Sequence, residues 1–191
     1  MAAALFLTAY NLWDERRAGE AARRALEQMP ETEQRPDALP SGPGEQEIPD
    51  YILNPDMEMP TVDIDGTLYI GTLDIPALDL SLPVISEWSY PGLKIAPCRY
   101  AGTAYKGNFV IAGHNYSTYF GPLGRLSSGD RVDFTDVDGN LFSYEVAEIQ
   151  TLDPADVDDM VADGWDLSLF TCTPSWTKRL TVRCDKIETG D

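Results

Sequence analysis

Short runs of apolar and β-branched residues follow one another from residue 67 to residue 184, and glycine, proline or aspartate ends most of them. Some alternate with polar residues, which is typical of strands that bury one face. NFVIAGH (108–114) is continuously apolar instead, which indicates a strand buried on both faces. The strands predicted within 131–152 flank Asp138-Gly139, a strong hairpin signal. Many short strands joined by turns predict an all-β domain, either a closed barrel or a sandwich.

The first 30 residues predict a helix that changes in character along its length. MAAALFLTAYNLW (1–13) is apolar, but it is too short to span about 30 Å of hydrocarbon, which requires about 20 residues. From Asp14 to Pro30 the composition is helical and charged. One interpretation is an amphipathic helix packed on the domain. The abrupt change at Asp14 favours the other, in which residues 1–30 are the remnant of a truncated membrane anchor.

The next segment separates this helix from the strands. Residues 31–58 are rich in proline, glutamate and glycine, a composition that buries little surface and predicts a solvated linker. We therefore assign residues 59–191 to one folded domain. The formal net charge of −18 is spread along the chain and repels phosphate, which argues against a nucleic-acid partner.

The sequence offers little for a metal or cofactor. No cysteines form a C-x-x-C pair, and the single histidine cannot complete a zinc-ligand set. The acidic pairs Asp63/Asp65 and Asp136/Asp138 lie beside glycines and lack the spacing of a complete EF-hand loop. We interpret both pairs as turns and expect no metal or other cofactor.

The chain has three cysteines and one histidine, and the histidine and two of the cysteines end predicted strands. His114 and Cys172 each follow an apolar run, at the position where a rigid scaffold presents side chains to a cleft. A thiol requires a nearby base or cation to react as a thiolate at neutral pH. Any cysteine–histidine catalyst in this chain must therefore use His114.

A cationic residue follows Cys172 closely enough in the sequence to lie beside it in the fold. Arg179 lies seven residues after Cys172, and the loop between them allows a tight reversal. A guanidinium there would donate to a developing oxyanion or hold a substrate carbonyl. Lys178 and Arg183 are rivals, but Lys178 points to the opposite strand face and Arg183 lies farther along the same face. Arg179 is therefore the favoured stabiliser.

Taken together, these motifs resemble those of the sortase family. The family's strand-borne TLxTC signature corresponds to SLFTC (168–172), in which Ser168 replaces the first threonine and keeps a hydroxyl. The histidine-bearing element corresponds to Gly113-His114, and the arginine that opens the last strand corresponds to Arg179. The motifs occur in the family's order across roughly residues 66–186, and their joint occurrence is more specific than any one of them.

The resemblance implies a closed eight-stranded sortase-type β-barrel with short helices, preceded by the N-terminal helix and linker. It also implies a cysteine transpeptidase, a peptidase-type hydrolase in which Cys172 attacks the threonine carbonyl of an LPxTG-like sorting signal. His114 would protonate the leaving amine and Arg179 would stabilise the tetrahedral intermediate. The partners would be surface proteins that carry the signal, and an amine on a cell-wall precursor or a pilin. The catalytic domain would be extracellular, held at the cell membrane by a single N-terminal anchor.

The resemblance also suggests how the substrate is bound. Ser168 and Thr171 of the signature strand and Trp176 of the following loop are predicted to contact the substrate. For Trp176, an exposed loop residue without such a role is the alternative. Residues 153–165 predict one or two helical turns that would shape the groove. The segment 51–60 is interpreted as a connecting loop, with an active-site lid as the alternative.

An outward-facing domain permits a disulfide, and Cys98 and Cys184 are the candidates because their pairing would leave Cys172 free. Both are expected at the barrel end away from the active site. Two buried thiols are the alternative.

Other functions are compatible with a cysteine and a histidine on a β scaffold. An L,D-transpeptidase places glycine before its cysteine and arginine two residues after it, whereas this chain has Thr171 and Pro174 there. A hydrolytic cysteine peptidase would use water in place of the amine. A surface-anchored β-barrel binding module would keep the motifs without activity.

Overall fold

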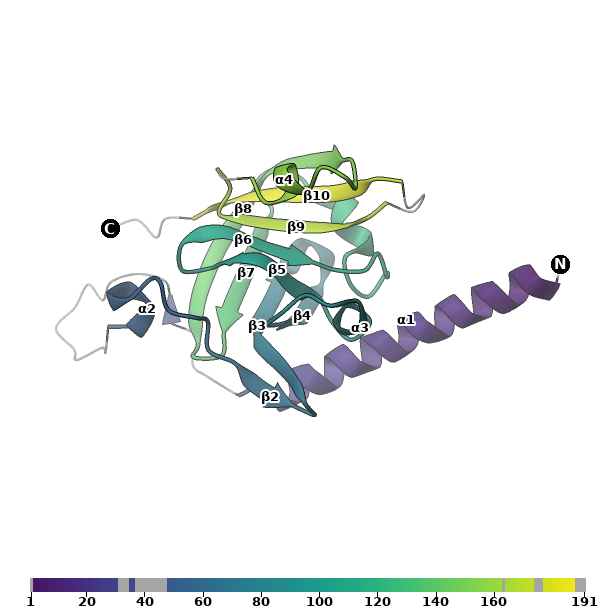
Figure 1. Ribbon diagram of the computed structural model, residues 1–191, viewed down its shortest axis with the longest axis horizontal. Coiled ribbons are helices and arrows are strands. Elements are labelled where there is room, and N and C mark those ends of the chain that lie inside the picture. Colours follow the sequence, from purple (N-terminus) through teal and green to yellow (C-terminus); the bar gives the residue numbers. More distant parts are fainter. Residues whose placement is uncertain (1, 31–34, 37–47, 163, 174–176, 188–191) are drawn as a thin grey trace.

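The computed structural model describes residues 2–30, 35–36, 48–162, 164–173 and 177–187, and more of these residues lie in strands than in helices (Figure 1). The helices and helical turns are α1 (Ala2–Gln28), α2 (Asp50–Leu53), η1 (Pro76–Leu78), α3 (Tyr90–Leu93), η2 (Gly121–Arg125) and α4 (Val157–Met160). The strands are β1 (Arg35–Pro36), β2 (Val62–Ile64), β3 (Thr67–Ile75), β4 (Leu80–Ile85), β5 (Cys98–Thr103), β6 (Gly107–Ala112), β7 (Arg131–Asp136), β8 (Asn140–Leu152), β9 (Leu167–Cys172) and β10 (Arg179–Lys186).

Eight of the ten strands in the sheet close into a ring, which we call the barrel. Its order is β8-β10-β9-β6-β5-β4-β3-β7, and β7 pairs again with β8. The two strands outside the ring, β1 and β2, pair with β8 and β3. β6 runs parallel to β9, and β9 runs antiparallel to β10. The prediction of an all-β, closed eight-stranded barrel with short helices and an N-terminal helix is confirmed.

The continuously apolar strand β6 is buried on both faces, as its sequence predicted. Phe109 and Ile111 point into the barrel and belong to its main core. Val110 and Ala112 point outward, into a second buried cluster that includes Leu93 of α3, Met160 of α4 and Ala25 of α1. Helices therefore cover the outer face of β6 and its neighbours, which is why apolar residues occur there without a break.

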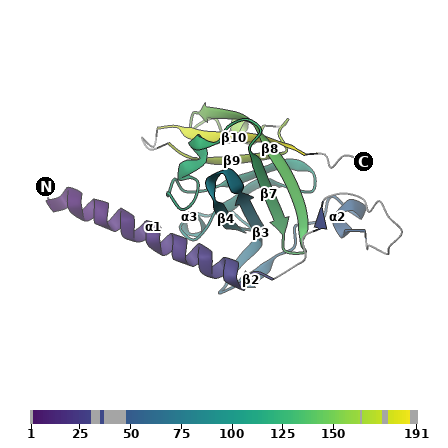
Figure 2. The same ribbon diagram turned by 180° about the vertical axis from the view of Figure 1, so that it is seen from behind.

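Helix α1 packs along one side of the barrel, and its N-terminal part projects beyond it (Figures 1 and 2). Ala18, Ala22 and Ala25 are buried, and their spacing places them on one helix face. Small alanine side chains let the helix lie close to β4. The second half of α1 is thus a helix docked on the domain. In the described part of the chain, no helix combines the length and apolar character that a membrane span requires.

Part of the predicted linker contributes to the fold. Tyr51 of α2 is buried, and its ring stacks on that of Tyr105 with centroids 4.7 Å apart. The centroid of the Phe142 ring also lies 5.2 Å from that of the Tyr51 ring. The packed structure therefore includes α2, before the domain boundary assigned at residue 59, while most of the linker lies outside the described residues.

Candidate active site

A compact loop after β6 holds His114. Gly113 extends the strand, because its N–H donates to the Phe170 carbonyl of β9 at 3.0 Å. The loop then closes on itself, since the Phe120 N–H donates to the His114 carbonyl at 3.1 Å. A Cβ atom added to Gly113 would lie 2.6 Å from the Phe120 ring, so this position requires glycine. The sequence Gly113-His114 thus places the imidazole directly after the buried end of β6.

Cys172 and Arg179 lie opposite each other at the end of β9 and the start of β10. The antiparallel register pairs the two residues directly. The Arg179 Nη1 atom donates to the Cys172 Sγ atom at 3.2 Å. The Thr173 N–H donates to the Lys178 carbonyl at 2.9 Å and keeps the strands together beyond this pair. The guanidinium is therefore in direct contact with the candidate nucleophile.

The strand register also brings His114 to this place. β6 and β9 are parallel neighbours in which Ala112 pairs with Phe170. Continuing that register by two residues places His114 beside Cys172, and adjacent strands lie about 4.8 Å apart. Alternate residues of a strand share a face. By this alternation, His114, Cys172 and Arg179 all occupy outward-facing positions. Three adjacent strands thus present an imidazole, a thiol and a guanidinium at one end of the barrel.

Two opposing effects act on the imidazole. Burial lowers the pKa of His114, because it disfavours the charged form. The carboxylate of Asp14 raises that pKa, whereas the Lys94 ammonium lowers it further. The charge state of His114 therefore depends on a residue of α1 as well as on its own loop.

The rival cations of Arg179 are engaged elsewhere. Arg183 is only 2% exposed, and its Nη1 atom donates to the Ser168 hydroxyl at 2.8 Å and to the Met160 carbonyl at 3.1 Å. Its Nη2 atom donates to the Asp159 carbonyl. The Lys178 ammonium donates to the Asp153 carboxylate at 3.2 Å. Arg183 thus ties α4 to the outer face of β9, while Arg179 contacts the thiol.

The predicted substrate contacts of Ser168 and Thr171 require correction. Ser168 is 2% exposed and its hydroxyl accepts the hydrogen bond from Arg183. Thr171 is 3% exposed and alternates with outward-facing Phe170 and Cys172, so it points toward the barrel interior. Neither side chain is accessible to a substrate in this conformation. Trp176, the third predicted contact, lies outside the described residues.

The predicted Cys98–Cys184 disulfide is wrong, since all three cysteines are free thiols. Cys98 pairs with Ala112, at the His114 end of the barrel, whereas Cys184 pairs with Leu167 at the other end. Two strands, β9 and β6, lie between β10 and β5 in the ring. Their combined spacing of about 14 Å far exceeds the Cα separation that a disulfide spans. Both residues are buried thiols, the alternative interpretation.

Thiol alkylation of the folded protein should label Cys172 alone. Burial raises the pKa of Cys98 and of Cys184 to about 12, so both remain protonated and shielded at neutral pH. Cys172 is partly exposed. Iodoacetamide treatment followed by peptide mass spectrometry should show one modified thiol in the native state and three after denaturation without reductant. Only one modified thiol after such denaturation would restore the disulfide.

The acidic pairs form turns, as predicted. Asp63 accepts a hydrogen bond from the Gly66 N–H at 2.8 Å. Asp136 accepts from the N–H groups of Asp138 and Asn140 at 3.0 and 2.9 Å. Its second oxygen accepts from the Tyr105 hydroxyl at 2.9 Å. Both oxygens of Asp136 thus accept hydrogen bonds, from the turn and from Tyr105. The described residues contain no group of three or more histidine, cysteine or acidic side chains arranged to hold a metal ion.

The segment 51–60 begins at the barrel end opposite to His114. Tyr51 stacks on Tyr105, which precedes β6, whereas His114 follows it. Asp56 forms an ion pair with Lys106 in the same turn. These contacts favour the connecting-loop interpretation over a lid that uses Asp56.

Sequence reasoning did not identify the aromatic residues beside the thiol. The Phe170 ring shares the outer face with Cys172 and meets the Tyr100 ring edge-on, with centroids 5.2 Å apart. Tyr100 in turn contacts Trp88, which is 37% exposed. Trp88, Tyr100 and Arg99 line a hollow of about 400 Å³. No sequence motif marks these residues, because they come from segments that only the closed barrel brings together.

A closed eight-stranded barrel that presents a thiol, a guanidinium and an imidazole on neighbouring strand ends defines a candidate site for thiol-based acyl transfer. The family model for the Sortase domain matches residues 73–187. The chain therefore belongs to the sortase family, whose members are cysteine transpeptidases of the cell surface. This membership argues against the L,D-transpeptidase alternative.

Solved sortase structures share the fold at moderate identity. Sortase C1 of GBS Pilus Island 1 is 25% identical with a TM-score of 0.57, and the match covers 64% of this chain and 66% of that one. A Clostridium perfringens sortase D5, described as a transpeptidase, is 25% identical with a TM-score of 0.56 over 62% of this chain and 79% of that one. Sortase C1 from Streptococcus agalactiae is 26% identical with a TM-score of 0.59 over 67% and 72%. The chain spans just under two thirds of the first of these. No curated protein sequence matches it.

Proposed function

We propose that this chain is a transpeptidase that cleaves an LPxTG-like sorting signal after its threonine and transfers the acyl group to an amine. The observation that carries the proposal is the contact of the Arg179 guanidinium with the Cys172 sulfur at 3.2 Å, at the end of the strand next to the one that leads to His114. The arrangement supplies a nucleophile, a cation for the oxyanion and a proton donor at one place.

The reaction follows from these three groups. The Cys172 thiolate attacks the threonine carbonyl, and the Arg179 guanidinium stabilises the negative charge that develops on the carbonyl oxygen. The C–N bond then breaks, and the amine leaves with a proton from His114. This step leaves a thioacyl enzyme on Cys172. An incoming amine attacks the thioacyl carbonyl, gives up a proton to His114, and releases the new amide and the Cys172 thiolate.

The proposal extends to the amine that accepts the acyl group and to the place of the domain in the cell. The acceptor would be an amine of a cell-wall precursor or a lysine of a pilin. Sortase C1 of GBS Pilus Island 1 and a pilus-related sortase C of Group B Streptococcus are among the similar structures, which supports the pilin. The domain would lie outside the cell membrane, held by the N-terminal segment. The projection of α1 beyond the barrel, on the side where Asp14 and Glu15 contact the histidine loop, supports this placement (Figure 1).

A peptide assay tests the function and separates its rivals. A fluorogenic LPxTG-type peptide is incubated with the protein, with and without an excess of a short amine nucleophile, and the products are identified by mass spectrometry. A transpeptidase should yield the new amide whenever the amine is present. Release of only the free acid would indicate a hydrolytic cysteine peptidase. No cleavage across a panel of sorting pentapeptides would favour a binding module instead.

Replacing Arg179 and Arg183 separately by alanine should distinguish a loss of catalysis from a loss of stability. Arg179→Ala should lower kcat/KM by about 10²–10³-fold, the cost of losing an oxyanion donor. Arg183→Ala removes buried hydrogen bonds to Ser168 and to α4 and should lower the free energy of unfolding by about 1–3 kcal/mol. Steady-state kinetics and urea unfolding of both variants provide the comparison. A greater loss of kcat/KM in folded Arg183→Ala would show that the stabiliser is assigned to the wrong residue.

A further inference from the structure

Helix α1 is bonded directly to the loop that carries His114. The Tyr116 hydroxyl donates to the Asp14 carboxylate at 2.8 Å, across 102 positions of sequence. The Tyr116 ring lies against the His114 ring, with centroids 4.9 Å apart and planes tilted by 34°. One tyrosine therefore connects a carboxylate of the N-terminal helix with the imidazole of the candidate site.

Two further contacts hold the histidine loop, residues 114–119, against the same helix. The Glu15 carboxylate accepts hydrogen bonds from the backbone N–H and the hydroxyl of Ser117. The Tyr119 hydroxyl donates to the Ala18 carbonyl at 2.7 Å and is completely buried. The loop is thus bonded to α1 at three successive places, in addition to its own closing hydrogen bonds.

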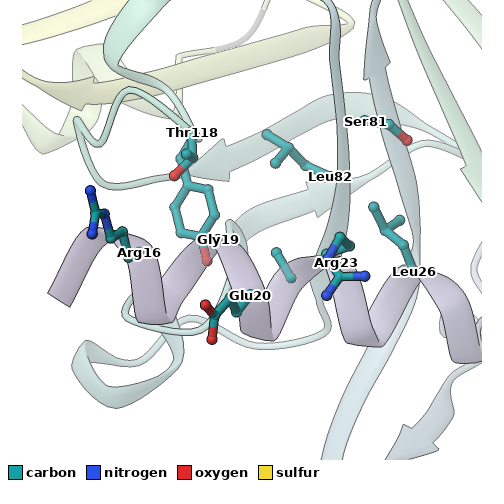
Figure 3. A pocket seen from close by; sticks show the side chains of 10 residues that line it. Arg16, Gly19, Glu20, Arg23, Leu26, Ser81, Leu82 and Thr118 are labelled. Atoms are coloured by element: carbon teal, nitrogen blue, oxygen red, sulfur yellow. The ribbon is translucent and has the colours of Figure 1, made fainter. Parts of the chain in front are cut away.

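The helix is packed less completely beyond these contacts. A groove of about 440 Å³ lies between α1 and β4, and Thr118 and Tyr119 form one end of it (Figure 3). Gly19, Ala22 and Leu26 line its helical side, with Leu82 across from them. The groove does not include His114 or Cys172. The polar contacts of Asp14 and Glu15 are therefore the ones that relate the position of α1 to the site.

The charges around the imidazole give this connection a chemical consequence. Asp14 approaches from α1 and Lys94 from the segment after α3, while Cys172 and Arg179 lie on β9 and β10. The Asp14 carboxylate raises the pKa of His114, opposing both burial and Lys94. Asp14 and Lys94 thus have opposite effects on His114, and it is Asp14 that favours the imidazolium.

We propose that Asp14, acting through Tyr116, is a positioning residue that orients the His114 imidazole beside Cys172. The negative charge that Asp14 brings near the ring also favours the imidazolium. This role rests on the proposed function only where it concerns catalysis, because an imidazolium is the form that donates a proton to the leaving amine. The N-terminal helix is accordingly part of the active-site architecture as well as a support for the barrel.

The single histidine makes this inference testable without a substrate. The ring proton signals of His114 in the full chain are followed by NMR as the pH is varied, in the parent protein and in Asp14→Asn, Tyr116→Phe and Asp14→Glu. Asp14→Asn removes a negative charge that favours the imidazolium, so the titration midpoint should move to lower pH. Asp14→Glu keeps the charge and should restore the midpoint, and Tyr116→Phe should alter the ring shifts because its link to Asp14 is lost.

Glu27→Gln is the matched control, because it removes the same charge from an exposed position near the other end of α1. Its midpoint should equal that of the parent. An unchanged midpoint in Asp14→Asn, or an equal shift in Glu27→Gln, would overturn the proposal.

Kinetics supply the second readout. With a cleavable sorting peptide, Asp14→Asn should lower kcat with little change in KM, and Asp14→Glu should recover most of the loss. An equal loss in Asp14→Glu, or a change confined to KM, would contradict a positioning role. If no peptide is cleaved, the proposed function fails while the NMR titration still decides the inference.

Discussion

Cys172→Ala is expected to abolish both cleavage of the sorting peptide and amide formation, leaving no turnover above the uncatalysed background. The acyl group has no other thiol to occupy, because burial raises the pKa of Cys98 and Cys184 to about 12 and both are enclosed in the core. Replacing one sulfur by hydrogen at a partly exposed strand end should leave the fold intact. The measurement is product formation with and without amine, beside thermal unfolding of the variant.

Cys98→Ala is the matched control for this experiment. It removes the same atom from a buried site on β5, so it should cost some stability but keep most of the turnover. Comparable activity in Cys172→Ala and in the parent protein would contradict the assignment of the nucleophile.

His114→Gln should lower kcat/KM by about 10²–10⁴-fold, the range by which a positioned acid or base accelerates a reaction. Glutamine keeps polar atoms in the loop but cannot titrate. An amine leaves readily only when it is protonated, and the chain has no second imidazole to supply the proton. Steady-state kinetics with the peptide substrate measure the loss.

A second substrate distinguishes proton donation from a general disturbance of the site. An aryl ester of the same acyl sequence has a leaving group that departs without protonation. His114→Gln should therefore acylate Cys172 from the ester far better, relative to the parent, than from the peptide. An equal loss with both substrates would argue against His114 as the proton donor.

The parts of the site predicted from the sequence are those governed by local rules. Strand alternation and the short loop after Cys172 place Arg179 across from it, and the structure has this register. The buried apolar run before His114 ends at Gly113, and this pattern was enough to place His114 at a strand end. Both inferences required only the pattern within one strand or one hairpin.

Other features depend on how distant segments meet in the closed ring. Cys98 and Cys184 were matched by elimination, but the order of strands in the barrel separates them. Ser168 belongs to a signature strand, yet its hydroxyl is used by Arg183, a contact 15 residues away. Nothing near Asp14 in the sequence indicates that it meets Tyr116, because α1 packs against a loop that follows it by about a hundred residues. Such contacts follow from tertiary packing, which single-sequence patterns do not encode.

Intact-protein mass spectrometry during reaction with a sorting peptide tests the central claim most directly. In the absence of an amine, the protein should gain the mass of the acyl portion that ends in threonine, and peptide mapping should place it on Cys172. Addition of an amine should remove this mass and release the corresponding amide. Cleavage of the peptide without any adduct, or an adduct on another residue, would contradict the account.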